Sequence, residues 1–223
     1  SILVLEAGGN DFRPDIKVPI GYGMTFFNPK VNWCYVSTPQ EHLNGRSLYV
    51  PRGKVLGGSA SINAMVYLRG QKNDFDDWAS FSSQDLGWDS VRSTYDAIEG
   101  IRDNLGKQKI HVSDVSKDHE LMVQDFIQSG ERLGFRQNLD LNGNSSEGIG
   151  HYPISTRNGM RWTASDGFLK PAMRLRNLTV FKNSQVTKLI TANGRVTELE
   201  FLKGKSKLKK VKIRIGAVLT AGA

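Results

Sequence analysis

The sequence predicts a mixed α/β fold, and three observations carry that prediction. The chain opens on an apolar run at residues 2–5 that lacks alternation and ends at Glu6, which indicates a parallel strand buried on both faces. Apolar residues at helical spacing follow in the middle of the chain, and β-rich runs fill its last third. With 223 residues, the chain is long enough for one large domain or two small ones.

Residues 10–50 are predicted to form an irregular cover. They carry many prolines, glycines and aromatic residues without periodicity, and irregular segments of this length are usually functional lids. Short extended pieces are expected at residues 33–37 and 47–50.

Two helices are predicted after residue 71. Asp89 can cap the first, whose apolar positions Val91, Tyr95 and Ile98 follow helical spacing. The second can begin at Ser116 or Asp118 and end at Gly134. Its expected inward-facing residues are Leu121, Met122, Phe126, Ile127 and Leu133.

The last third is predicted to be mostly strand. Asn193-Gly194 between two β-rich runs is a strong hairpin signal. The expected elements are a loop at 136–150, a strand at 151–156, a short helix at 165–174, and strands at 178–181, 185–191, 195–202, 207–215 and 217–220.

Composition and charge exclude several classes of protein. Hydrophobic residues make up 39% and charged residues 23%, which rules out a disordered chain, a coiled coil and a fibrous repeat. No window approaches the roughly 18 apolar residues of a membrane helix. The single cysteine, Cys34, excludes an internal disulfide and a cysteine-rich zinc site. No metal site is expected, because the histidines lack ligand spacing; they are His42, His111, His119 and His151.

The net charge of +8 comes almost entirely from one tract. Seven basic residues and no acidic one lie between Lys203 and Arg214, which leaves +1 for the rest of the chain. A single basic hairpin or a lysine-rich edge strand explains this tract, because lysines at a sheet edge hinder pairing with another chain. Nucleic-acid binding is therefore not expected.

Both ends of the chain lie in predicted buried strands, the second at residues 217–220. The sequence supplies too little to cover either strand, so we expect an internal fragment of a longer protein. No signal peptide is expected from the first residues of this sequence. A cytoplasmic protein is expected, with contact to a membrane surface left open.

The segment at residues 51–70 carries the densest chemistry. Gly57 and Gly58 let the backbone approach a ligand closely, and the turn that follows suits a pyrophosphate. A plain loop-to-helix joint capped by Ser59 or Ser61 is the alternative. The segment is not a Walker loop, since no Gly-Lys-Ser/Thr closes it.

Glu6 ends the first predicted strand. In a dinucleotide-binding fold, the second strand ends in an acid that accepts hydrogen bonds from the adenosine ribose. An ordinary strand end is an equally good reading of Leu5-Glu6-Ala7-Gly8.

Residues 51–70 strongly resemble the first signature of the glucose–methanol–choline (GMC) family of FAD-dependent alcohol oxidoreductases, with the closest likeness to choline dehydrogenases and similar bacterial alcohol dehydrogenases. Further similar segments lie at residues 5–9, 32–33, 73–78, 158–164, 176–180 and 221–223. The resemblance implies an incomplete, Rossmann-like FAD-binding domain with part of an antiparallel-sheet-plus-helices substrate-binding domain. The implied division is FAD-binding parts at 1–72 and 165–223 and a substrate-binding part at 73–164.

The resemblance also implies cofactor-binding residues. Glu6 would bind the ribose with Gly8 nearby, and the backbone of Val186 would hold the adenine. Packing alone would explain Val186 and Val55 equally well. The other implied positions are Trp33 in the covering segment, Val55, Gly57, Gly58 and Ser59 along the diphosphate and ribityl chain, Asn63, Ala64, Met65 and Val66 beside the flavin, and Ala221 and Gly222 in a loop returning to the cofactor.

The implied activity is oxidation of a small primary or secondary alcohol by hydride transfer to flavin N5, with oxygen or a quinone as electron acceptor. Some members attach FAD through a histidine just before the Asn; Ile62 stands there, so noncovalent FAD is expected. The family's catalytic histidine belongs to a C-terminal segment outside this chain, and no catalytic residue is assigned. Two alternatives are an FAD-containing hydroxynitrile lyase and a non-enzymatic basic binding module.

Overall fold

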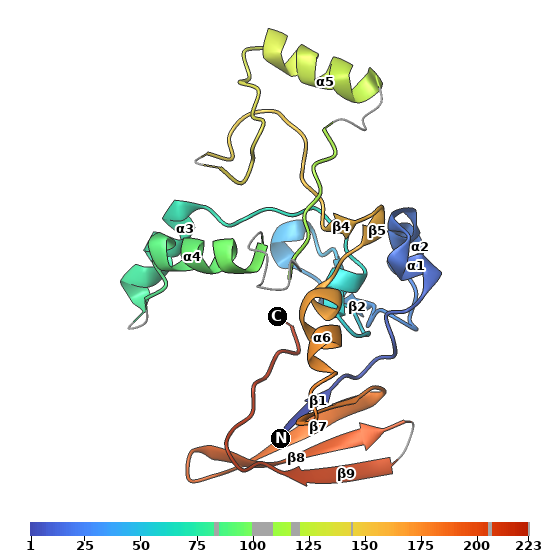
Figure 1. Ribbon diagram of the computed structural model, residues 1–223. Coiled ribbons are helices and arrows are strands. Elements are labelled where there is room, and N and C mark those ends of the chain that lie inside the picture. Colours follow the sequence, from blue (N-terminus) through green and yellow to red (C-terminus); the bar gives the residue numbers. More distant parts are fainter. Residues whose placement is uncertain (83–84, 100–108, 117–120, 144, 205–206, 223) are drawn as a thin grey trace. The chain divides into compact units, whose positions relative to one another are not determined.

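The computed structural model describes residues 1–82, 85–99, 109–116, 121–143, 145–204 and 207–222 (Figure 1). The chain divides into two compact units. The first combines residues 1–64 with residues 163–223, and the second comprises residues 65–162. Each unit is described by itself below.

The first unit contains the predicted parallel pair. β1 (Ile2–Leu5) runs parallel to β6 (Leu178–Phe181) in the register Ile2↔Leu178 to Leu5↔Phe181. The expectation that β1 is buried on both faces is wrong: Ile2 is exposed and the other three residues are half-buried. Among the described residues β6 is the one strand that pairs with β1, so its other edge is not covered by a further strand.

A three-stranded antiparallel sheet follows in the order β7 (Ser184–Ala192), β8 (Arg195–Lys203) and β9 (Lys207–Lys212), seen as the orange and red arrows of Figure 1. Asn193 and Gly194 have φ of 51° and 73°, so the two-residue hairpin turn is confirmed. The lysine-rich β9 is an edge strand, as its composition predicts.

The strand predicted at residues 217–220 is wrong, and that predicted at 207–215 ends at Lys212. Val218 and Leu219 are strongly exposed. An apolar run becomes a strand only where a neighbouring strand offers a free edge, and no described strand pairs with these residues.

The core of the first unit lies under the covering segment. Ile16, Val31, Val55 and Ile62 form one buried cluster that joins this segment to the glycine-rich one. The covering segment contains no long helix, as predicted. Its two extended pieces are present, and the structure shows that they pair with each other. Its elements are α1 (Pro14–Lys17), α2 (Tyr22–Thr25), β2 (Tyr35–Val36), β3 (Tyr49–Val50) and 3₁₀ turns at Pro19–Gly21 and Glu41–Leu43.

The helix predicted at residues 165–174 is present in two parts. Ser165–Leu169 form a single π-helical turn, and α6 (Lys170–Ala172) continues it. Short π-helical turns are rare and are often found at functional sites. A 3₁₀ turn at Gly58–Ser61 is the remaining helical piece of this unit among the described residues.

The second unit is built on α3 (Lys72–Phe81), α4 (Trp88–Glu99) and α5 (Leu121–Arg132). The Phe75 ring of α3 packs against Trp88 and Tyr95 of α4, with ring centroids 5.9 and 6.2 Å apart. Asp89 lies inside the first turn of α4, where a carboxylate favours the helix dipole, and not at the predicted cap position.

The predicted orientation of α5 is largely wrong. Ile127 and Gly130 are buried, and Ile149 lies where a side chain at position 130 would go. Leu121, Met122, Phe126 and Leu133 are all strongly exposed. The reason is that the apolar surface of α5 is wider than the face that the loop around Ile149 covers. The proposed start at Asp118 lies outside the described residues.

The strand predicted at residues 151–156 is reduced to a hairpin at its end. β4 (Thr156–Arg157) pairs with β5 (Met160–Arg161). Before it, Ile154 makes isolated bridges to Val66 and Ser113. The loop predicted at 136–150 is irregular, as expected.

Candidate functional site

The glycine-rich segment adopts a backbone that other residues rarely allow. Gly57 and Gly58 have φ of +88° and +57°, in the left-handed region that favours glycine. A side chain at Gly57 would meet the Ser61 hydroxyl at 2.5 Å, whereas a side chain at Gly58 would meet nothing within 4 Å. The turn is therefore closely packed at Gly57 and open at Gly58.

This segment lies against the end of β1. The Lys54 carbonyl oxygen lies only 1.8 Å from where a Cβ on Gly8 would be, and Gly9 forms a parallel bridge with Val55. The Leu56 N–H donates to the Gly9 carbonyl at 3.1 Å. The residues that follow β1 and the start of the glycine-rich segment thus meet backbone to backbone.

Glu6 has a fixed side chain at this junction. The Gly8 N–H donates to its Oε1 at 2.7 Å. Burial raises the pKa of Glu6 above its ordinary value, and the Gly8 hydrogen bond opposes that rise. The Ser184 N–H donates to the Glu6 carbonyl at 2.8 Å, which brings the start of β7, two residues before Val186, to the same place.

The covering segment is fastened to residues 52–54. The Trp33 N–H donates to the Arg52 carbonyl at 2.8 Å, and the Lys54 ammonium lies 4.3 Å from the centre of the Trp33 ring. Asn32 is buried, and its Oδ1 accepts from the backbone N–H groups of Cys34 and Arg52. Trp33 therefore lies beside the start of the glycine-rich segment.

The end of the described chain returns to the same region. Gly222 has a φ of +96°, and a side chain there would lie 3.2 Å from Cδ of Arg52. Gly222, and with it Ala221, is thus close to the start of the glycine-rich segment.

The four residues implied beside the flavin divide between the two units. Asn63 and Ala64 are exposed at the end of one unit, and Met65 and Val66 begin the other. Met65 has a φ of +65° and is buried, and its carbonyl accepts hydrogen bonds from the Ser155 N–H and hydroxyl at 2.8 and 3.2 Å. A non-glycine residue in this conformation is strained, which is frequent at functional sites.

Sequence reasoning missed a group of charged residues behind the glycine-rich segment. Asp11, Lys17, Asp166 and Lys170 form ion pairs with one another within the first unit. The four-residue spacing of Asp166 and Lys170 on a predicted helix could have indicated their ion pair. The pairs between residues far apart in the sequence leave no such pattern.

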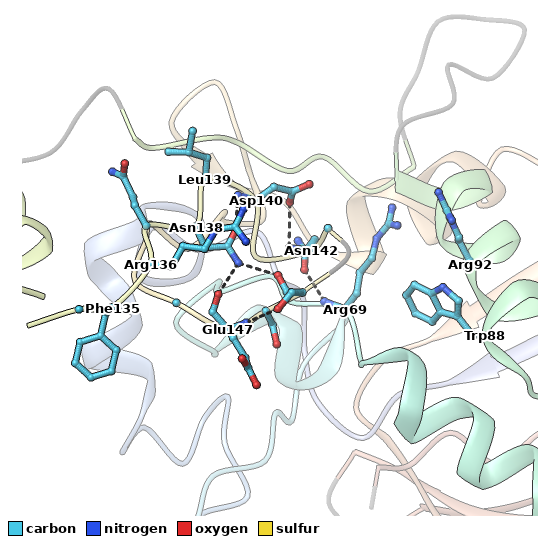
Figure 2. Close-up of a pocket in the computed structure, with 16 residues that line it drawn as sticks. Arg69, Trp88, Arg92, Phe135, Arg136, Asn138, Leu139, Asp140, Asn142 and Glu147 are labelled. Atoms are coloured by element: carbon cyan, nitrogen blue, oxygen red, sulfur yellow. Dashed lines mark hydrogen bonds between the residues drawn. The ribbon is translucent and has the colours of Figure 1, made fainter. Parts of the chain in front are cut away.

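A separate pocket of about 1360 Å³ lies wholly within the second unit. Figure 2 shows Arg69, Trp88 and Arg92 on one side and the loop at residues 134–148 on the other. The guanidinium of Arg69 donates to the Glu99 carboxylate, and the backbone N–H of Arg69 donates to Asn142 Oδ1 at 2.7 Å. None of the predicted cofactor residues lines this pocket, so we assign it no role in cofactor binding.

Two expectations concern metals and membranes. Within the described residues, no group of three or more His, Cys, Asp or Glu side chains could hold a metal ion. The search of those same residues finds no helix with the length and apolarity to cross a membrane. His119 lies outside the described residues.

Comparison with known proteins identifies the family. The family model described as GMC oxidoreductase matches residues 15–223. An alcohol dehydrogenase [acceptor] of Pseudomonas putida is 33% identical over 208 residues, covering 90% of this chain and 37% of that protein. An oxygen-dependent choline dehydrogenase of Sinorhizobium fredii is 33% identical over 230 residues, covering 100% of this chain and 41% of that protein.

A solved structure also matches the fold of this chain. Pyridoxine 4-oxidase from Mesorbium loti matches with a TM-score of 0.83 and 28% identity, covering 94% of this chain and 42% of that one. The chain thus spans about two fifths of the length of the relatives it matches. The mixed α/β fold with an FAD-binding part is confirmed. The chain belongs to the GMC oxidoreductases, a family of flavoproteins that bind FAD.

Proposed function

We propose that this chain supplies much of the FAD-binding site of an enzyme that oxidises a small primary or secondary alcohol, choline-like or otherwise, with oxygen or a quinone as electron acceptor. The relatives named as alcohol and choline dehydrogenases support this class of substrate. The observation that carries the proposal is the glycine turn at 57–58, which is open at Gly58 and directly follows the residues at 54–56 that contact the backbone after β1.

The residues present fit the cofactor. The Gly8 N–H orients the Glu6 carboxylate, which would accept hydrogen bonds from the ribose hydroxyls. Gly58 leaves room for the diphosphate to approach the backbone. Val55, Gly57 and Ser59 would complete that surface. The remaining assignments are Trp33 in the cover, Asn63, Ala64, Met65 and Val66 beside the flavin, Val186 at the adenine, and Ala221 and Gly222 in the returning loop.

Bound FAD would supply the redox chemistry by taking hydride from the alcohol carbon at flavin N5. The chain's own residues would bind and orient it. We assign no residue of this chain as the base that accepts the hydroxyl proton. FAD is proposed to be noncovalent, because Ile62 has no nucleophile and its side chain lies in the core cluster.

The test uses the full-length protein. Its absorption spectrum should show flavin bands, and an alcohol substrate added without oxygen should bleach them. Acid precipitation should release the flavin into the supernatant. A colourless protein would contradict the proposal, and flavin that stays in the pellet would contradict noncovalent binding. Flavin that no alcohol bleaches would favour a non-redox enzyme such as the hydroxynitrile lyase.

A further inference from the structure

Four charged side chains from distant parts of the sequence form a closed cluster in the first unit. The Lys17 ammonium donates to both oxygens of Asp166 at 2.8 Å and contacts Asp11 Oδ2 at 3.3 Å. The Lys170 ammonium donates to Asp11 Oδ2 at 2.7 Å and to Asp166 Oδ1 at 2.6 Å. Each ammonium therefore bridges both carboxylates. We call these four residues the ion cluster.

The ion cluster is attached to the glycine turn through Thr163. The backbone N–H and the hydroxyl of Thr163 donate to Asp166 Oδ2 at 3.0 and 2.9 Å. Thr163 is buried, and its hydroxyl oxygen lies 3.2 Å from where a Cβ on Gly57 would be. Ser165 Cβ lies 3.3 Å from the same point. Thr163, which Asp166 holds, is therefore one of the residues that pack against the turn at Gly57.

The cluster is costly to bury, which argues against a purely stabilising role. The Asp11 side chain is fully buried, and its Oδ1 has no hydrogen-bond partner in the described part of the chain. Buried ion pairs often stabilise a protein no more than apolar residues of the same size would, so fixing one geometry is their better-supported use. The two carboxylates and two ammoniums also balance in charge.

Two members of the ion cluster, Asp166 and Lys170, are stabilised in their charged forms by their partners. Burial alone would raise the pKa of Asp166, but hydrogen bonds from Lys17 and Lys170 hold it below its ordinary value. Burial alone would lower the pKa of Lys170, but its bonds to Asp11 and Asp166 raise it.

We propose that the ion cluster is a positioning device for the cofactor: through Thr163 it holds the Gly57 turn in the shape that receives the FAD diphosphate. The inference rests on the proposed function. Asp11 and Lys17 belong to the covering segment, so the same cluster ties that segment and the residues behind the turn to one point.

The test compares two substitutions of Thr163 in the full-length protein. Thr163→Val keeps the shape but removes the hydroxyl that binds Asp166, and Thr163→Ser keeps that hydroxyl. We expect Thr163→Val to weaken FAD binding to the apoprotein by about tenfold, with Thr163→Ser within about twofold of the unchanged protein. Fluorescence titration of the apoprotein with FAD gives both values. The phosphorus NMR signals of bound FAD should shift in Thr163→Val alone.

A merely structural role would give a different pattern. In that case Thr163→Val would lower the melting temperature of the apoprotein and leave FAD affinity and the phosphorus signals unchanged, which would overturn the inference. Glu200→Gln, which removes an ion pair of the same unit whose lysine, Lys210, is 57% exposed, is the matched control. Asp166→Asn should reproduce the loss of affinity; if it fails to fold, the Thr163 pair decides. An unchanged protein that binds no FAD would contradict the proposed function, whereas equal binding by all variants would contradict the positioning role alone.

Discussion

The surroundings of the glycine turn, in the first unit, and the outer face of α5, in the second, differ in what they bury. The first unit buries charge and backbone: Asp11 is fully enclosed, and Gly8 touches the Lys54 carbonyl. In the second unit, large apolar side chains on α5 are exposed, including Met122 and Phe126. This difference predicts where substitutions will lower the free energy of unfolding, because a substitution can remove only the contacts that the original residue makes. Around the glycine turn the contacts are close and directional, and on the outer face of α5 they are few.

The largest effect is expected where a side chain would strike backbone. Gly8→Ala places a methyl group 1.8 Å from the Lys54 carbonyl oxygen, and neither backbone can yield without breaking the bridge at Gly9. We expect a loss of about 3 kcal/mol or more in the free energy of unfolding. Gly23→Ala is the control, since nothing lies within 4 Å of its added methyl group and it sits in α2. Denaturant unfolding that finds the two variants equal would contradict the close contact.

The next effect concerns the ion cluster. Asp166→Asn leaves two partly buried ammoniums facing one buried carboxylate, and breaking such a cluster costs about 3 kcal/mol. Lys72→Met, which removes an exposed ion pair with Asp76 on α3, should have no measurable effect. Denaturant unfolding of both variants checks the contrast. Equal losses of unfolding free energy in Asp166→Asn and Lys72→Met would show that the ion cluster is no more enclosed than a surface ion pair.

Acid should weaken the first unit through the same carboxylate. Because the pKa of Asp166 is lowered in the folded protein, its contribution to stability is present above the unfolded value of about 4 and is lost as pH falls through the folded value. The difference in unfolding free energy between the unchanged protein and Asp166→Asn should therefore shrink at low pH. A difference that stays constant from neutral pH into this range would contradict the assignment.

Much of this fold follows from local rules. The positive φ angles of Asn193 and Gly194 and the paired strands on either side follow from a two-residue turn signal. The glycine turn follows from a motif whose residues permit its backbone. Such features depend on residues close in sequence, so they can be predicted from one chain.

The errors share one cause, which is dependence on a distant partner. The pairing of Asp11 with Lys170 spans 159 residues and leaves no pattern in either segment. The run at 217–220 has strand composition but no described strand beside it. Of the inward-facing residues predicted for α5, only Ile127 is buried, and it lies three positions before Gly130, which packs against Ile149. Composition shows that a residue can be buried, and the partner decides whether it is.

The smallest effect on the free energy of unfolding is expected on the exposed face of α5, and a buried neighbour on the same helix gives the comparison. Ile127→Ala should cost about 2–3 kcal/mol, because its side chain is buried. Phe126→Gln, one position away, should change the free energy of unfolding by no more than about 0.5 kcal/mol, because 69% of Phe126 is exposed and a glutamine suits a helix. Both are measured by denaturant unfolding of the full-length protein. A loss at Phe126 as large as that at Ile127 would mean that the outer face of α5 packs against something beyond the described residues. The prediction of a small loss for Phe126→Gln would then be wrong, and so would the contrast between the outer face of α5 and the surroundings of the glycine turn.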